Sequence, residues 1–435
     1  MVHDNLHKLT DPEYSYQYFV NGSPTVRKVG DKRVLVGGLS HGGKGYFALD
    51  VTDPYNMSHD KVLWEFTAED DPDLGYSFSR PIIRETNAGW VALFGNGYNS
   101  VNGDAILFAI DINNGNVVEK IETHTGGSNG IVSAVAAIDP DFDGYIDFVY
   151  AGDLKGNLWK FDFQADNSNE WGVAYNNSPL FTARNAAGDV QPITSQPDVM
   201  FHCQYPGYLV IFGTGKLVSE LDFGNIQAQN VYGIWDWEKA WDQIDGETGN
   251  DKAFGTFLPD RTLSNMTGDL SDLTLLYQEV TGELTHTDGN DYLIVSGNEI
   301  NWYDPQAGEL EAGIESHVGW YFQLPDDGER VTIDPVIRGD HVHIVSTIPT
   351  DDPCMAGGTS NRYALNACTG GAPSRPQFFD EDGKPIEGVG GKRYDETIPG
   401  FTVLEPGEVI ISQDDELIIE KLDSDRSGLT YWHEW

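Results

Sequence analysis

Basic residues are scarce in this sequence of 435 residues, in which 26 Lys and Arg stand against 69 Asp and Glu. The formal net charge is therefore −43 at pH 7. A surface with this charge repels nucleic acid and anionic membranes, and it attracts cations. We expect no nucleic-acid partner. The same acidity fits either secretion or a salty habitat and does not choose between them.

Long apolar runs are also absent. No run approaches the roughly 18 to 20 apolar residues that a membrane-spanning helix needs, so we expect no membrane insertion. The first residues, Met1 to Asp4, lack the apolar core of a signal peptide. This start indicates either a cytosolic protein or a chain that begins inside a longer one.

Cysteine is rare, and the three cysteines form no C-x-x-C pair, so a zinc knuckle is not expected. Cys354 and Cys368 flank a loop rich in Gly, Ser and Thr. A disulfide between them would contribute about 3 kcal/mol on the chain-entropy model and would imply an oxidising compartment. The alternative is two unrelated buried thiols. We expect the bridge, and we interpret Cys203 as a small buried residue.

Glycine and aromatic residues are plentiful, with 49 glycines and 12% aromatics, which is typical of many short strands joined by turns. One unit recurs along the chain. An apolar strand ends in a small residue and, after a turn, a second strand alternates aliphatic and aromatic residues and ends near a polar one. Seven pairs of segments fit, the last two more loosely: Val34–Gly38 with Gly45–Asp50, Val91–Gly95 with Ala105–Asp111, Phe148–Gly152 with Gly156–Asp162, Leu209–Gly213 with Val231–Asp236, Leu293–Gly297 with Ile300–Asp304, Val342–Ser346 with Asn361–Asn366, and Val409–Ser412 with Glu416–Lys421.

Outer strands frame several of these pairs. The segments Ser23–Val26, Arg80–Ile83, Val132–Ile138 and Gln196–Val199 precede the first four pairs, and Lys61–Phe66 and Val117–Ile121 follow the first two. Four strands a repeat predict an all-β fold, a β-propeller of about seven four-stranded blades. We expect residues 1–435 to form a single propeller domain, with residues 1–20 as a lead-in segment. A β-sandwich is the competing fold, but the regular recurrence argues against it.

Between two predicted strands of the third repeat lies a loop with the pattern D-x-D-x-D-G-x-x-D. Four aspartates in one short loop repel each other, and a hard divalent cation relieves that repulsion. Gly144 permits the sharp turn that gathers the oxygens. Position twelve, where an EF-hand places a glutamate, is Tyr150, so position nine closes the shell. The predicted calcium ligands are the carboxylates of Asp139, Asp141, Asp143 and Asp147 and the main-chain carbonyl of Tyr145.

The simpler alternative is a solvated acidic turn, which suits a single Asp-Gly pair better than four aspartates in this register. The loop lies at one end of one predicted blade and away from the propeller axis. This position favours a structural or regulatory ion over a catalytic one.

Several long runs resemble the C-terminal propeller domain of the PilY/PilC family, the tip-associated adhesins and assembly factors of type IV pili. The resemblance spans nearly the whole chain and includes the loop from Asp139 to Asp147. The runs are Lys8–Pro12, Tyr18–Thr25, Leu35–Leu39, Gly42–Pro54 and Tyr150–Asp162.

The resemblance implies that calcium in this loop governs pilus extension against retraction, and with it twitching motility and surface attachment. It implies as partners the pilus tip complex with its minor pilins, and host or abiotic surfaces. It also implies an extracellular location at the pilus tip or outer-membrane surface. Family members carry a signal peptide and a large N-terminal region, often von Willebrand A-like. We therefore expect this chain to be the C-terminal part of a larger secreted protein without enzymatic activity.

Two other classes of function stay open. Strands such as Gly45–Asp50 also resemble the blades of quinoprotein dehydrogenases, but those enzymes hold calcium on the propeller axis with scattered ligands. A purely structural propeller, in which the ion only stiffens the loop, uses the same ligands as a switch.

Three short motifs favour structural interpretations. Gly38–Gly42 matches G-x-S-x-G, but it joins two predicted strands where a nucleophile elbow needs a strand and a helix. His341 and His343 share a strand face without a clear third metal ligand nearby. Arg338–Asp340 reads Arg-Gly-Asp, and it is predicted to be a β-turn between two strands.

Overall fold

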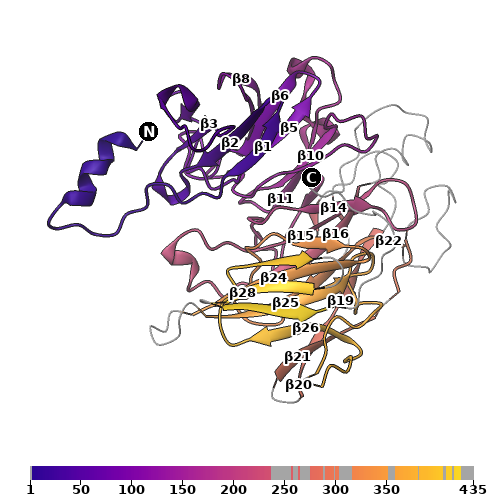
Figure 1. Ribbon diagram of the computed structural model, residues 1–435. Helices are drawn as coiled ribbons and strands as arrows, with labels where there is room; N and C mark the ends of the chain where they lie inside the picture. Colours follow the sequence, from indigo (N-terminus) through magenta and orange to yellow (C-terminus); the bar gives the residue numbers. More distant parts are fainter. Residues whose placement is uncertain are drawn as a thin grey trace, which may run out of the picture. The chain divides into compact units, whose positions relative to one another are not determined.

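The computed structural model describes residues 2–236, 256–257, 263–264, 275–287, 290–297, 299–302, 316–350, 358–380, 382–404, 408–413 and 416–422. The chain divides into two compact units, Met1–Pro179 and Leu180–Trp435 (Figure 1). Both units are built almost entirely of strands. None of the described helices is long and apolar enough to cross a membrane.

The strands of the first unit belong to three sheets, and within the unit the paired strands are antiparallel and follow one another in sequence. A 3-10 helix, η1 (His3–Thr10), precedes them. The strands are β1 (Thr25–Val29), β2 (Lys32–Gly38), β3 (Gly45–Asp50) and β4 (Val62–Thr67) in one sheet, β5 (Ile82–Thr86), β6 (Gly89–Gly95), β7 (Ile106–Asp111) and β8 (Val117–Glu122) in the next, and β9 (Ala136–Ile138), β10 (Phe148–Gly152), β11 (Asn157–Asp162) and β12 (Gly172–Val173) in the third.

Burial explains why the central strands are continuous apolar runs. In β7, five of six residues are buried, whereas β1 alternates half-buried and exposed side chains as an outer strand should. Between the first two sheets, Tyr46 stacks on Phe94 with ring centroids 3.8 Å apart, and Phe108 packs beside them. Each such ring contributes about 2 to 3 kcal/mol by leaving water.

The run Asp153–Trp159, which the sequence resemblance included, forms one buried hydrogen-bond network. The Asp153 carboxylate is fully buried and accepts hydrogen bonds from the side chains of Asn157, Trp159 and Asn129, each at 2.8 Å. Burial raises the pKa of Asp153, although these donors favour its anionic form. The polar residues of this run are therefore explained by one structural requirement, which is to supply hydrogen bonds to a buried carboxylate.

The second unit holds three larger or irregular sheets among the described residues. In the first, β14 (Asp198–Phe201), β15 (Tyr208–Gly213), β16 (Asn230–Asp236), β22 (Ser316–Gln323) and β19 (Leu275–Val280) lie side by side. The second sheet has the order β20 (Gly282–Thr287), β21 (Asn290–Val295), β26 (Val389–Tyr394), β25 (Gly358–Asn366), β24 (His341–Pro349) and β23 (Val336–Arg338). The third contains β27 (Gly400–Leu404), β28 (Glu408–Gln413) and β29 (Glu416–Lys421).

Short elements complete the described chain. They are η2 (Ser40–Gly42), η3 (His59–Lys61), η4 (Ser168–Glu170), α1 (Ala174–Asn177), β13 (Phe181–Thr182), η5 (Glu220–Asp222), β17 (Thr256–Phe257) and β18 (Leu263–Ser264).

Six of the seven predicted strand pairs are confirmed as antiparallel neighbours, and the fifth is wrong. Its first segment supplies the last three residues of β21, but β20 and β26 occupy both edges of that strand. Ile300 and Asn301 lie outside any strand, Trp302 makes one isolated bridge to His317, and residues 303–304 lie outside the described part of the chain. The number of blades stays a prediction.

The predicted disulfide is wrong in its partner. Cys368, which follows β25, is bonded to Cys203, which follows β14, with their Cα atoms 6.0 Å apart. Cys203 is exposed and is therefore not the small buried residue that we expected. Cys354 lies outside the described residues. The sequence favoured the shorter loop, but the fold brings two turns 165 residues apart together.

The predicted turns at two of the short motifs, Gly38–Gly42 and Arg338–Asp340, are confirmed. Ser40–Gly42 forms a single 3-10 turn between β2 and β3, where a nucleophile elbow would need a following α-helix. Gly339, with φ of 61°, and Asp340 form the two-residue turn between β23 and β24. His341 and His343 are both buried.

Candidate metal centre

The aspartate-rich loop of residues 139–147 connects β9 to β10 in the third sheet, as predicted. The pairing of β9 with β10 holds the two ends of the loop together. Ile138 lies opposite Phe148, and the Asp147 N–H donates to the Ile138 carbonyl at 2.9 Å. Ile146 is buried, and its N–H donates to the carbonyl of Glu85 in β5. The loop is therefore held by its own sheet and by the neighbouring one.

Within the loop, backbone N–H groups turn inward onto the aspartates. The Gly144 N–H donates to Asp139 Oδ2 at 2.9 Å, and the Asp143 N–H lies 3.2 Å from Oδ1 atoms of both Asp139 and Asp141. This winding needs two left-handed residues, Phe142 with φ of 62° and Gly144 with φ of 97°. The glycine adopts that conformation without strain, which is the role predicted for it.

Three of the predicted ligands lie together. Carboxylate oxygens of Asp139, Asp141 and Asp147 lie within 4.8 Å of one another. Asp143 is not in this group, and its Oδ1 accepts the Tyr145 N–H at 2.8 Å. Tyr145 is exposed at the edge of the loop.

The electrostatics of the loop are those of crowded anions. Burial raises the pKa of Asp139, and the charge of Asp143 raises it further, while the N–H of Gly144 lowers it in part. A cation among these carboxylates would oppose both unfavourable effects. Because every donor is an oxygen, the set fits a hard cation such as Ca²⁺, with Asp143 and the Tyr145 carbonyl near enough in the chain to complete the shell.

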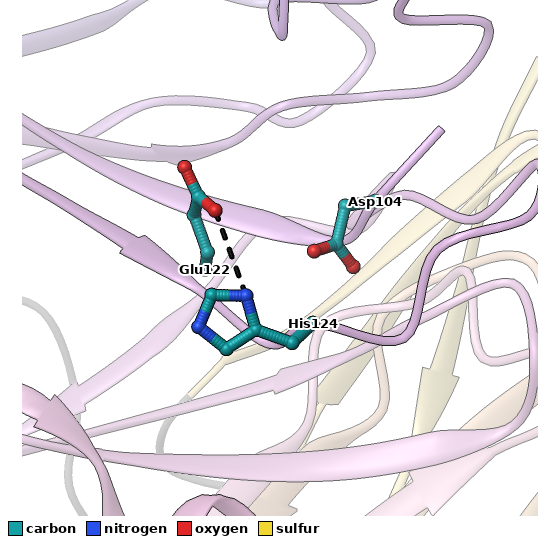
Figure 2. Close-up of side chains that lie close together, drawn as sticks. All are labelled: Asp104, Glu122 and His124. Carbon is teal, nitrogen blue, oxygen red and sulfur yellow. Dashed lines mark ion pairs between the residues drawn. The ribbon is translucent and has the colours of Figure 1, made fainter. Parts of the chain in front are cut away.

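A second cluster of metal-binding residue types lies where β7 begins and β8 ends, and the sequence did not lead us to it. Asp104, Glu122 and His124 point toward one another there (Figure 2). The only sequence signal is Glu-x-His at the end of a predicted strand, which is too common to identify a site.

The chain matches the family model of the PilY1 beta-propeller domain over residues 1–264. It is 36% identical over 409 residues to the type IV pilus biogenesis factor PilY1 of Pseudomonas aeruginosa strain PAO1, an alignment that covers 87% of this chain and 33% of the relative. A PilY1 homolog of Xylella fastidiosa is 34% identical, with 84% of this chain and 24% of the relative covered. The chain thus spans a third or less of the length of these relatives.

A solved structure, the C-terminal domain of Pseudomonas aeruginosa PilY1, has the same fold. It superposes with a TM-score of 0.72 at 28% sequence identity and covers 93% of this chain and 85% of its own. The sheets described above are accordingly those of a β-propeller.

Proposed function

The chain belongs to the PilY1 family of type IV pilus biogenesis factors, and on that premise we propose that it is the calcium-binding propeller of such a factor. It acts outside the cell at the pilus tip, where it contacts the minor pilins and contributes to surface attachment. Calcium in the loop of residues 139–147 biases the pilus toward extension or retraction and so controls twitching motility.

The gathering of three carboxylates at the corner between β9 and β10 is the observation that carries the proposal. Asp139, Asp141 and Asp147 converge although their like charges repel at short range. Calcium binds the gathered arrangement and not an opened one. It can therefore shift the loop between two states by as much as its affinity differs between them.

The anchoring of the loop explains how occupancy would reach the rest of the sheet. The backbone of Asp147 makes hydrogen bonds on both sides. Its N–H donates to the Ile138 carbonyl, and its carbonyl accepts the Phe163 N–H at 2.8 Å. The neighbouring Ile146 is bonded to Glu85 of the next sheet. A change at the ninth loop position is thus passed to β9, to the end of β11 and to β5.

We propose no enzymatic activity. The ligands in this loop are contiguous in sequence and come from one corner of one sheet, whereas a quinoprotein dehydrogenase needs an axial calcium held by scattered side chains. A quinone absorbance in the purified protein would contradict this part of the proposal. The purely structural alternative, in which calcium only stiffens the loop, requires a functional test.

That test uses the full-length protein in a piliated bacterium, with Asp147→Ala to mimic the empty loop and Asp147→Lys to place an ammonium where the ion binds. We expect the two variants to change surface piliation and twitching in different ways. Asp166→Ala, at an exposed aspartate of the same unit, is the matched control and should behave as wild type. If both Asp147 variants are exported and folded yet indistinguishable from the control, the regulatory role is wrong.

A further inference from the structure

The second metal-binding cluster is created by the register of β7 and β8. Ile106 of β7 lies opposite Glu122 of β8, so Asp104 and His124, each two residues beyond that pair, are brought opposite each other. The Thr123 N–H donates to the Ala105 carbonyl at 3.1 Å and continues the ladder between them. Donor atoms of Asp104, Glu122 and His124 consequently lie within 4.8 Å of one another (Figure 2).

Asp104 is fixed in place through only one of its two oxygens. Its Oδ1 accepts five hydrogen bonds, whereas Oδ2 accepts none from the described residues. The carboxylate thus presents one oxygen with unused lone pairs. The donors to Oδ1 are the N–H groups of Ala105 (2.8 Å), Thr125 (2.8 Å) and Gly126 (3.0 Å) and the hydroxyls of Thr125 (2.9 Å) and Thr123 (3.2 Å).

The loop that carries His124 is held from both sides. His124 has a left-handed backbone, with φ of 58°, and the next residue, Thr125, is bonded to Asp104 through its N–H and hydroxyl. On the opposite side, Lys155 Nζ donates to the Thr125 carbonyl at 3.0 Å. The imidazole itself is 70% exposed, and its Nδ1 lies 3.6 Å from Glu122 Oε2. A rigid backbone thus presents an accessible nitrogen beside two carboxylates.

The surroundings of the cluster are more negative than the nearby cation can offset. Lys120 Nζ lies 3.5 Å from Glu122, but it is closer to Asp73 at 2.6 Å and Asp71 at 3.1 Å. The Lys120 ammonium is therefore shared among three carboxylates, and it offsets the charge of Glu122 only in part. Such an imbalance raises the local attraction for an added cation.

We propose that Asp104, Glu122 and His124 form a binding site for a divalent transition-metal ion of the zinc class. An imidazole nitrogen with two carboxylate oxygens is a donor set that Zn²⁺ accepts, and three protein ligands leave one position for water. The all-oxygen loop at Asp139 suits calcium, so the two sites differ in metal preference. Zinc ligands at about 2.0 to 2.1 Å lie roughly 3.3 Å apart, so the exposed His124 and the half-buried Glu122 close slightly on the fixed Asp104.

The test is a titration of the 435-residue chain, prepared without a polyhistidine tag and with calcium in excess to occupy the aspartate loop. Zn²⁺ binding is followed by calorimetry, and Co²⁺ binding by its visible absorption, which reports the coordination geometry of the bound ion. We expect one site per chain. His124→Ala and Glu122→Gln should each weaken zinc binding by more than about tenfold.

Two controls locate the site. His59 is another exposed histidine and is the first residue of η3, with Asp60 next to it. His59→Ala should leave zinc binding unchanged. Asp147→Ala, in the aspartate loop, should also retain it, which separates this proposal from the calcium proposal. Asp104→Asn is not used, because the Asp104 carboxylate accepts five hydrogen bonds and its loss would also disturb the local structure. The test therefore rests on His124→Ala and Glu122→Gln. If wild type shows no stoichiometric zinc site, or if His124→Ala binds zinc as His59→Ala does, Glu122 and His124 form an ion pair only and the proposal is wrong.

Discussion

Cys203 and Cys368 are bonded across two turns of the second unit, 165 residues apart in sequence. Cys203 lies in the turn after β14 and Cys368 directly after β25, so the bond links two different sheets of that unit. On the chain-entropy model a loop of this length restricts the unfolded chain by about 5 kcal/mol. Such a bond persists in oxidising compartments, which fits the proposed extracellular location.

The first prediction concerns this bond. Peptide mapping without reduction should recover the Cys203 peptide linked to the Cys368 peptide. Cys203→Ser and Cys368→Ser should lower the free energy of unfolding by a similar amount, about 2 to 5 kcal/mol, because either change opens the same loop. Cys354→Ser is the matched control and should have little effect. Recovery of Cys354 linked to Cys368 would contradict the assignment.

The second prediction is that the chain binds one calcium ion in the Asp139–Asp147 loop and that Asp147→Ala abolishes the binding. No acidic residue stands at the twelfth position to replace Asp147, where Tyr150 is buried in β10. Calorimetric titration with calcium checks this, with the Asp166→Ala variant as control. A titration curve for Asp147→Ala that matches that of the control would remove the assignment.

The third prediction concerns a buried ion pair in the second unit. The Arg362 side chain is 1% exposed, and its Nη2 lies 2.6 Å from Glu420 Oε2. Lys392 Nζ and the Tyr394 hydroxyl donate to the other oxygen at 3.0 and 2.7 Å. Glu420→Gln should destabilise the chain by about 3 to 5 kcal/mol, because it leaves the charge of Arg362 buried without its partner. Denaturant unfolding checks this, and the exposed Glu387→Gln should stay within about 0.5 kcal/mol of wild type.

The fourth prediction is the pH dependence of the same pair. Burial acts to raise the pKa of Glu420, but the charges of Arg362 and Lys392 outweigh it and lower the pKa to about 2. A carboxylate with a depressed pKa in the folded state stabilises the protein fully above its unfolded pKa, and this stabilisation is lost as the pH falls through about 4 toward 2. Wild-type stability should therefore fall across this window more steeply than that of Glu420→Gln. Parallel stability curves for the two proteins would show that the pair does not contribute.

The fifth prediction tests the packing between the first two sheets. Phe94 is fully buried and stacks on Tyr46. Phe94→Ala should lower the free energy of unfolding by about 3 to 5 kcal/mol, because it removes a large apolar side chain and leaves a cavity. Tyr55→Ala, at a side chain that is 96% exposed, is the control. Thermal and denaturant unfolding provide the measurement, and equal losses for both variants would contradict this account of the core.

Most of the fold was predictable because strand pairs in this chain form between sequence neighbours. A run such as Val91–Gly95 and its partner Ala105–Asp111 are joined directly by the loop of residues 96–104, so alternation and loop residues were enough to pair them. The fifth pair failed because β21 finds its second partner in β26, about a hundred residues later. Nothing local in Leu293–Gly297 distinguishes that partner from the segment that follows.

The sequence by itself determined the place of the aspartate-rich loop and six of the seven strand pairs, since both depend on residues within one short stretch whose spacing fixes their geometry. The loop reached its predicted corner between β9 and β10, and its calcium ligation stays a prediction. The tertiary structure alone decided that Cys203 pairs with Cys368 and that Asp104 lies opposite His124. Each of those pairs depends on how separate segments align. The cysteine pair depends on how two sheets pack, and the Asp104–His124 pair depends on the register of two strands. Contacts of that kind are set by the burial of many side chains together, which leaves no signal in the few residues that meet.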